Sequence, residues 1–169
     1  MMKKAIILII QIACVVFLIT TYNGLINVMP IPIKLAKENP IVTEIKNDLN
    51  KLGAPQEKIS ELSKAVFTSH QATGLNSKLI VALMYTESGF DKNAKGPPNR
   101  TNIRYRGLMQ TPFTSGFADA DILHGVRILE QKLKFTNYDL RNALALYKGG
   151  NNNIARQQAD EVLRIYRQL

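Results

Sequence analysis

The sequence has few of the residues that build disulfide and metal sites. Among its 169 residues there is one cysteine, Cys14, and there are two histidines, His70 and His124. A single thiol excludes an intrachain disulfide and a thiolate metal cluster. Neither histidine lies at ligand spacing from a cysteine or from the other histidine. We therefore interpret both histidines as structural and expect no metal site.

Acidic residues are also scarce relative to basic ones. The chain has 22 Lys and Arg against 13 Asp and Glu, which gives a formal net charge of +9. Such a charge favours polyanionic partners, namely nucleic acid, anionic lipid or a bacterial wall polymer, although it also serves solubility. The basic residues are scattered and form no long block with interleaved aromatic residues, so no nucleic-acid partner is expected.

Strand-like alternation of any length is missing, as is any internal repeat. Apolar residues instead recur at helical spacing in several segments. Two of them are expected to end at Gly74 and Gly89, and Asn76 is the expected N-cap of the second. The composition, 46% hydrophobic and 21% charged, is that of a globular chain. The pattern predicts an all-α domain over residues 51–169. Residues 30–50 are interpreted as a linker and a short amphipathic helix, which packs on the domain or forms a stalk.

The one long apolar run lies at the start of the chain. "MMKKAIILIIQIACVVFLIT" sets Lys3 and Lys4 before a run from Ala5 to Ile19. No small-x-small cleavage site follows, so we interpret residues 1–29 as an N-terminal transmembrane helix in preference to a cleaved signal segment. The two lysines predict a cytoplasmic amino terminus, with the rest of the chain on the other side of the membrane.

One carboxylate stands out at the end of an apolar segment. In "YTESGFD", Glu87 follows a run of core-type residues and comes just before Gly89. Desolvation by a hydrophobic wall raises the pKa of a carboxylic acid, which then donates a proton near neutral pH. Taken alone, however, the stretch favours a solvated glutamate at a helix end.

Two further segments change this interpretation. "RGLMQTP" follows a loop rich in glycine, proline and asparagine, and the side-chain amide of Gln110 suits sugar hydroxyl and acetamido groups. "ALALYKGG" predicts a helix whose last turn carries Tyr147, a residue that can stack and hydrogen-bond at once.

Together the segments Glu-Ser-Gly-Phe, Gly-Leu-Met-Gln and Ala-x-x-Tyr-x-x-Gly resemble the catalytic domain of the soluble lytic transglycosylase family. These lysozyme-like enzymes cleave bacterial peptidoglycan, and the likeness runs from about Gln56 to Tyr166. It implies an all-α, lysozyme-like transglycosylase domain. It also implies cleavage of the β-1,4 linkage between N-acetylmuramic acid and N-acetylglucosamine, with a 1,6-anhydro end as product.

The resemblance makes Glu87 the single catalytic acid and base, with no metal or organic cofactor. The residues that it implies for substrate binding are Ser88, Thr101, Met109, Gln110 and Tyr147. The sequence departs from the family pattern at several positions. Thr101 stands in for a serine, and Lys148, next to Tyr147, replaces the usual asparagine. Such departures are typical of divergent members carried by phages or by conjugation and secretion systems.

An ordinary glycosidase needs two carboxyl groups across the scissile bond, and Asp91, Asp119 and Asp121 are the candidates for a second. We expect a structural role for each. A hydrolase of the same linkage and a non-catalytic wall-binding assembly module remain as alternative functions. The expected partners are peptidoglycan strands and the membrane. The expected location is the inner membrane, with a single pass and the C-terminal domain in the periplasm, or the virion for a phage protein.

Overall fold

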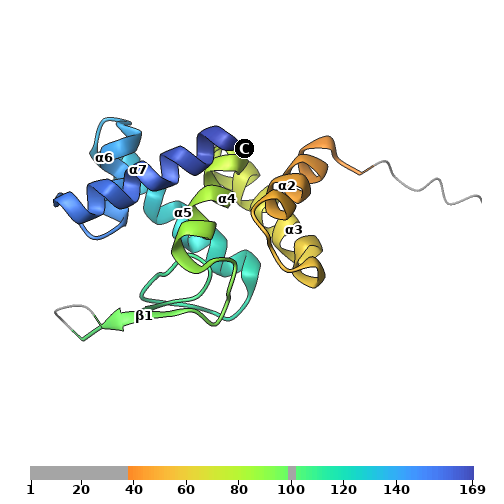
Figure 1. Cartoon of the computed structure of the whole chain (residues 1–169), viewed down its shortest axis with the longest axis horizontal. Helices are drawn as coiled ribbons and strands as arrows, with labels where there is room; N and C mark the ends of the chain where they lie inside the picture. Colours follow the sequence, from red (N-terminus) through yellow and green to blue (C-terminus); the bar gives the residue numbers. More distant parts are fainter. Residues whose placement is uncertain (1–37, 99–101) are drawn as a thin grey trace, which may run out of the picture. The chain divides into compact units, whose positions relative to one another are not determined.

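The computed structural model describes residues 38–98 and 102–169, and this part of the chain is mostly helical (Figure 1). Within these two ranges no helix is both long and apolar enough to cross a membrane. The anchor predicted over residues 1–29 lies outside the described residues. The elements are α2 (Pro40–Lys51), α3 (Gln56–Thr73), α4 (Ser77–Ser88), β1 (Lys95–Pro98), β2 (Arg104–Arg106), α5 (Ala118–Phe135), α6 (Leu140–Tyr147) and α7 (Asn153–Gln168).

The helices begin and end where local chemistry dictates. The side chain of Asn76 accepts a hydrogen bond from Lys78 N at 2.9 Å and caps α4, as the sequence predicted. Gly74 and Gly89 end α3 and α4 in the left-handed conformation, which costs glycine little. Because α4 ends at Gly89, the Glu87 side chain projects from the last turn of this helix.

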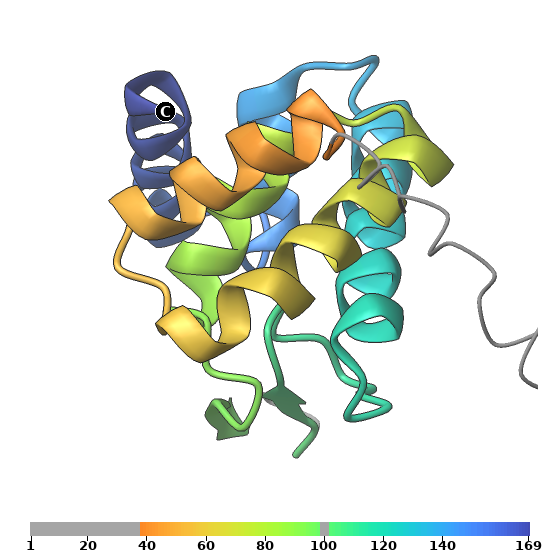
Figure 2. The ribbon, with the colours of Figure 1, turned by 90° about the vertical axis from the view of Figure 1, so that its right-hand side faces the viewer.

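Helix α4 is the centre of the core. Its residues from Leu79 to Met84 are all buried, which explains why this segment is apolar on nearly every side. Helices α2, α3 and α7 pack against α4, and α5 packs against α3 and α6 (Figure 2). Because Ile45 and Leu49 of α2 are fully buried in this core, α2 packs on the domain and is not a free stalk.

A short antiparallel ribbon of β1 and β2 accompanies the helices and was not predicted from the sequence. Lys95 pairs with Arg106 and Pro98 with Arg104, with an irregularity between the two pairs. Almost all of these side chains are exposed, so neither face needs the apolar alternation by which strands are recognised. The prolines in "KGPP" also make a strand unexpected from the sequence, because proline has no N–H group for strand pairing. An edge ribbon tolerates them.

Candidate active site

The three predicted motifs meet at one cleft. Its volume is about 1070 Å³, and its walls come from the end of α4, the ribbon, the end of α6 and the start of α7. The lining residues are Thr86, Glu87, Ser88, Ala94, Lys95, Gly96, Pro97, Pro98, Tyr105, Gln110, Tyr147, Lys148, Gly149, Asn152 and Gln158. Glu87 is the one carboxylate among them.

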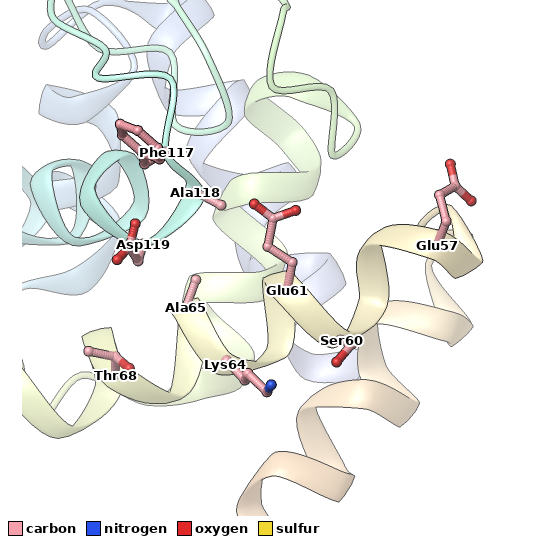
Figure 3. Close-up of a pocket in the computed structure, with 9 residues that line it drawn as sticks. All are labelled: Glu57, Ser60, Glu61, Lys64, Ala65, Thr68, Phe117, Ala118 and Asp119. Carbon is pink, nitrogen blue, oxygen red and sulfur yellow. The ribbon is translucent and has the colours of Figure 1, made fainter.

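A second depression lies between α3 and the start of α5 (Figure 3). Three of its lining residues, Glu57, Glu61 and Asp119, carry carboxylates, and all three are exposed. None of the three motifs contributes to this depression. We therefore assign the candidate active site to the cleft at Glu87, where the acidic side chain is buried.

Glu87 projects from the last turn of α4 into the cleft, and only 12% of its side chain is exposed. Burial raises the pKa of this carboxyl group above its ordinary value, because the charged form is poorly solvated there. The neighbouring Lys148 acts in the opposite direction and lowers the pKa by a smaller amount. The net effect is a raised pKa, as the apolar approach to Glu87 in the sequence predicted.

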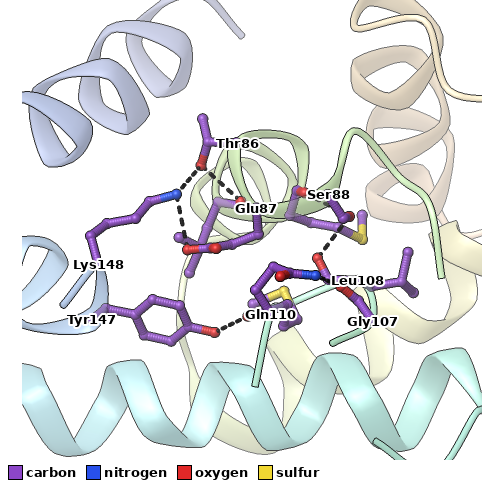
Figure 4. A network of polar contacts seen from close by, with 11 residues as sticks. Thr86, Glu87, Ser88, Gly107, Leu108, Gln110, Tyr147 and Lys148 are labelled. Atoms are coloured by element: carbon purple, nitrogen blue, oxygen red, sulfur yellow. Dashed lines mark hydrogen bonds and ion pairs between the residues drawn. The ribbon is translucent and has the colours of Figure 1, made fainter. Parts of the chain in front are cut away.

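Lys148 forms a buried ion pair with this acid (Figure 4). Its Nζ lies 2.9 Å from Glu87 Oε1, and only 6% of its side chain is exposed. Nζ also donates a hydrogen bond to Thr86 Oγ1 at 2.9 Å. The contact with Glu87 is close but poorly directed, because Oε1 has no partner with proper hydrogen-bond angles in the described structure. The pair is thus held mainly by charge.

Two hydroxyl groups fasten the Gly107–Gln110 segment beside Glu87 (Figure 4). Ser88 Oγ donates to Leu108 O at 2.9 Å, with Met84 O as an alternative acceptor at 3.2 Å. Tyr147 Oη donates to Met109 O at 2.8 Å. Burial, and to a smaller extent the negative charge of Glu87, raises the pKa of the Tyr147 phenol well above its ordinary value. The phenol therefore stays a donor at all physiological pH values.

The structure separates the two adjacent residues that were expected to line the cleft together. Gln110 lines it, although its Nε2 is already bonded to Ala94 O at 3.1 Å and to Gly107 O at 3.0 Å. Met109 is only 1% exposed, lies in the core and does not line the cleft. Gln110 therefore has its amide oxygen to offer to a sugar, while Met109 shapes the cleft from beneath.

Sequence reasoning missed the role of Gly125 on α5. A Cβ atom at this position would lie 2.4 Å from Met109 Cβ and 2.9 Å from Tyr147 Oη. Real Cβ contacts are not this short, so glycine is required for the loop and the tyrosine to approach α5. The available signal in the sequence was a glycine in the middle of a helical segment. Glycine weakens a helix there, so its presence indicates a packing or functional requirement.

The other carboxylates have local partners. Asp91 Oδ1 accepts a hydrogen bond from Asn93 N at 2.9 Å in the turn after α4. Asp121 is buried and accepts from Ser115 N at 2.6 Å and from the hydroxyl of Thr114. Among the residues that line the cleft, no second carboxylate accompanies Glu87. The expected substrate-binding residue Thr101 lies outside the described residues.

With this geometry in place, the comparison with protein families becomes informative. Residues 64–117 match the family model of the transglycosylase SLT domain. This part of the chain is similar to that domain. The match includes Glu87 and the Gly107–Gln110 segment, and it ends before Tyr147 and Lys148. The comparison with curated proteins found no match.

The SLT match supports the resemblance drawn from the three motifs. In general terms it indicates lytic-transglycosylase-type activity and binding of peptidoglycan. The matched segment covers α4, the ribbon and most of α3, while the residues that pair with the acid and fasten the loop come from the end of α6. The match therefore covers the acid and ends before Lys148.

Proposed function

We propose that the protein is a peptidoglycan lytic transglycosylase that cleaves the β-1,4 linkage between N-acetylmuramic acid and N-acetylglucosamine. The observation that carries the proposal is a single buried carboxyl group, Glu87, with a raised pKa in a cleft of about 1070 Å³. Gln110 and Tyr105 add a polar and an aromatic group to the same cleft, which suits sugar rings. The SLT match supports the same reaction class.

A reaction with one carboxyl group can be written in two steps. In the first step, the Glu87 carboxylic acid protonates the bridging oxygen. The bond from that oxygen to C1 of the muramic acid breaks, and the carbonyl oxygen of the 2-acetamido group bonds to C1. In the second step, the 6-hydroxyl oxygen attacks C1, displaces the acetamido oxygen and gives its proton to Glu87. The product is a 1,6-anhydro end, and the enzyme recovers its acid.

The fold supports this use of one residue. A retaining glycosidase needs its second carboxyl group about 5 to 5.5 Å from the first, and an inverting one needs it farther away. The described residues that line the cleft include no carboxylate besides Glu87. An internal nucleophile, the 6-hydroxyl group, replaces the missing group without requiring a positioned water molecule.

The test is the release of soluble muropeptides from purified cell wall by the wild type and by Glu87→Gln. We expect the variant to lose essentially all activity, because an amide cannot donate the proton. Mass spectrometry of the products then identifies the reaction. Anhydro ends support the proposal, reducing ends heavier by one water show a hydrolase, and wall binding without release shows a non-catalytic module.

We further propose that residues 1–29 anchor the domain in the inner membrane with the domain facing the periplasm. Lys3 and Lys4 before the apolar run support this orientation, and peptidoglycan lies on that side of the membrane. A reporter enzyme that is active only in the periplasm, fused after Leu169, tests the orientation. An active reporter in the membrane fraction supports the proposal, whereas a soluble protein of reduced mass shows that the segment is cleaved.

A further inference from the structure

The ion pair in the cleft sets a charge beside the proposed acid that the reaction itself does not need. Lys148 Nζ lies 2.9 Å from Glu87 Oε1, with both side chains nearly buried. An ammonium group at this distance favours the carboxylate form of the glutamate. Cleavage, however, begins with the carboxylic acid form. As long as the pair is intact, Lys148 opposes the effect of burial and disfavours the form of Glu87 that starts the reaction.

The contacts around Lys148 allow its ammonium group to be transferred. Its contact with Glu87 lacks hydrogen-bond angles, and its hydrogen bond goes to a neutral hydroxyl, Thr86 Oγ1. An ammonium group has three donors, so a further acceptor can be added while the Thr86 contact is kept. Lys148 also ends α6 and is followed by Gly149 and Gly150, both at φ values near 120°. The side chain thus stands just past the last turn of α6.

The charge around the cleft favours an anionic ligand. Its lining residues include two lysines, Lys95 and Lys148, against the single carboxylate of Glu87. The β2 strand adds Arg104 and Arg106 in exposed positions, with Arg106 paired to Lys95 across the ribbon. Fixed cations at the wall of a cleft raise the local concentration of anions. Wall glycans carry carboxylates on the muramic lactyl group, where it is free, and on the peptide stems.

We propose that Lys148 is a specificity-determining residue whose ammonium group passes from Glu87 to a carboxylate of the bound glycan strand. The inference rests on the proposed function, because it assumes that Glu87 is the acid. The strand thereby removes the charge that opposed the acid form of Glu87, and only a strand with a carboxylate near the scissile linkage does so. The domain accordingly selects anionic glycan strands over neutral ones.

The test compares kcat/KM of the full-length protein, kept in mild detergent, on three preparations of glycan strands. The first has intact peptide stems, the second has its stems removed so that the lactyl carboxylates are free, and the third has all its carboxylates converted to amides. We expect at least one carboxylate-bearing preparation to be cleaved about tenfold faster than the amidated one, the effect of one charged hydrogen bond. Of the two carboxylate-bearing preparations, the one cleaved faster shows whether Lys148 binds a stem carboxylate or a lactyl carboxylate.

Lys148→Met should abolish this preference, and Lys148→Arg, which keeps the charge, should retain it. Lys92→Met is the matched control, because it removes a lysine from the exposed turn ahead of β1 and should retain the preference. Circular dichroism shows whether each variant is folded. If Lys148→Met does not fold, Lys148→Gln takes its place.

Three results would overturn the inference. They are equal rates of the wild type on all three preparations, a preference that survives in Lys148→Met or Lys148→Gln, and an equal loss of preference in Lys92→Met. Any of these leaves the proposed function intact, provided that Glu87→Gln is inactive. If the wild type cleaves none of the strands, the proposed function fails, and the inference that rests on it fails as well.

Discussion

The Glu87–Lys148 pair permits a quantitative prediction about stability. Two unit charges 2.9 Å apart attract each other by about 6 kcal/mol at an effective dielectric constant of about 20. Desolvation of both ions offsets much of this attraction, so the intact pair contributes little net stability. Removal of one partner is different, because it leaves a buried charge uncompensated. Lys148→Met should therefore lower the free energy of unfolding by about 3 kcal/mol near pH 8.

The stability lost in Lys148→Met should depend on pH in a defined direction. In Lys148→Met, burial raises the pKa of Glu87 without an opposing lysine. A carboxyl group whose pKa is higher in the folded state stabilises the fold below its unfolded pKa. That stability is lost as pH rises through the folded pKa. The deficit of the variant relative to the wild type should thus be smallest near pH 4, about the pKa of a free glutamate, and largest near pH 8.

Urea unfolding at both pH values measures this deficit. The chain has no tryptophan, so far-ultraviolet circular dichroism of the helices is the suitable probe. The double variant Glu87→Gln/Lys148→Met removes both charges, and it should regain stability to within about 1 kcal/mol of the wild type. The reasoning is refuted if Lys148→Met is as stable as the wild type near pH 8, or if the double variant is no more stable than Lys148→Met.

The remaining predictions concern the supports of the cleft. Gly125→Ala should destabilise the domain by about 1 to 3 kcal/mol in urea unfolding, since the methyl group meets Met109, and it should reduce muropeptide release. Tyr147→Phe should cost about 1 kcal/mol and lower kcat more than it changes KM, because the loop loses its anchor. Asp121→Ala should speed hydrogen exchange at Ser115 N, which donates to that carboxylate, while the exchange of α7 amides stays unchanged.

The prediction of the helices from the sequence worked where the signals are local. Asn76 as an N-cap and Gly74 and Gly89 as terminators lie within one turn of the groups that they satisfy, so their neighbours in the chain suffice. The β1–β2 ribbon could not be predicted in this way. Its pairing depends on backbone groups and a loop between the strands, and its exposed side chains leave no alternating pattern.

The candidate site was predictable in part for the same reason. The position of Glu87 at the end of an apolar helix is visible in the sequence, but alone it favoured a solvated glutamate, and the other two motifs were needed to predict a buried acid. The packing of the Met109 side chain into the core cannot be read from the sequence, because it depends on the space left by Gly125 on α5. Resemblance to a family assigns Met109 to the cleft, while packing in this chain assigns it to the core.

By itself, the sequence determined the helical class, the helix ends and the acid that leaves the core, because each of these depends on residues close together in the chain. Only the tertiary structure decided which group would face that acid. Lys148 lies at the end of α6, far along the chain from Glu87, and no local pattern connects the two. Their contact results from the packing of α4, α5, α6 and α7, which brings an ammonium group to the acid and hence selects the kind of strand on which we propose it acts.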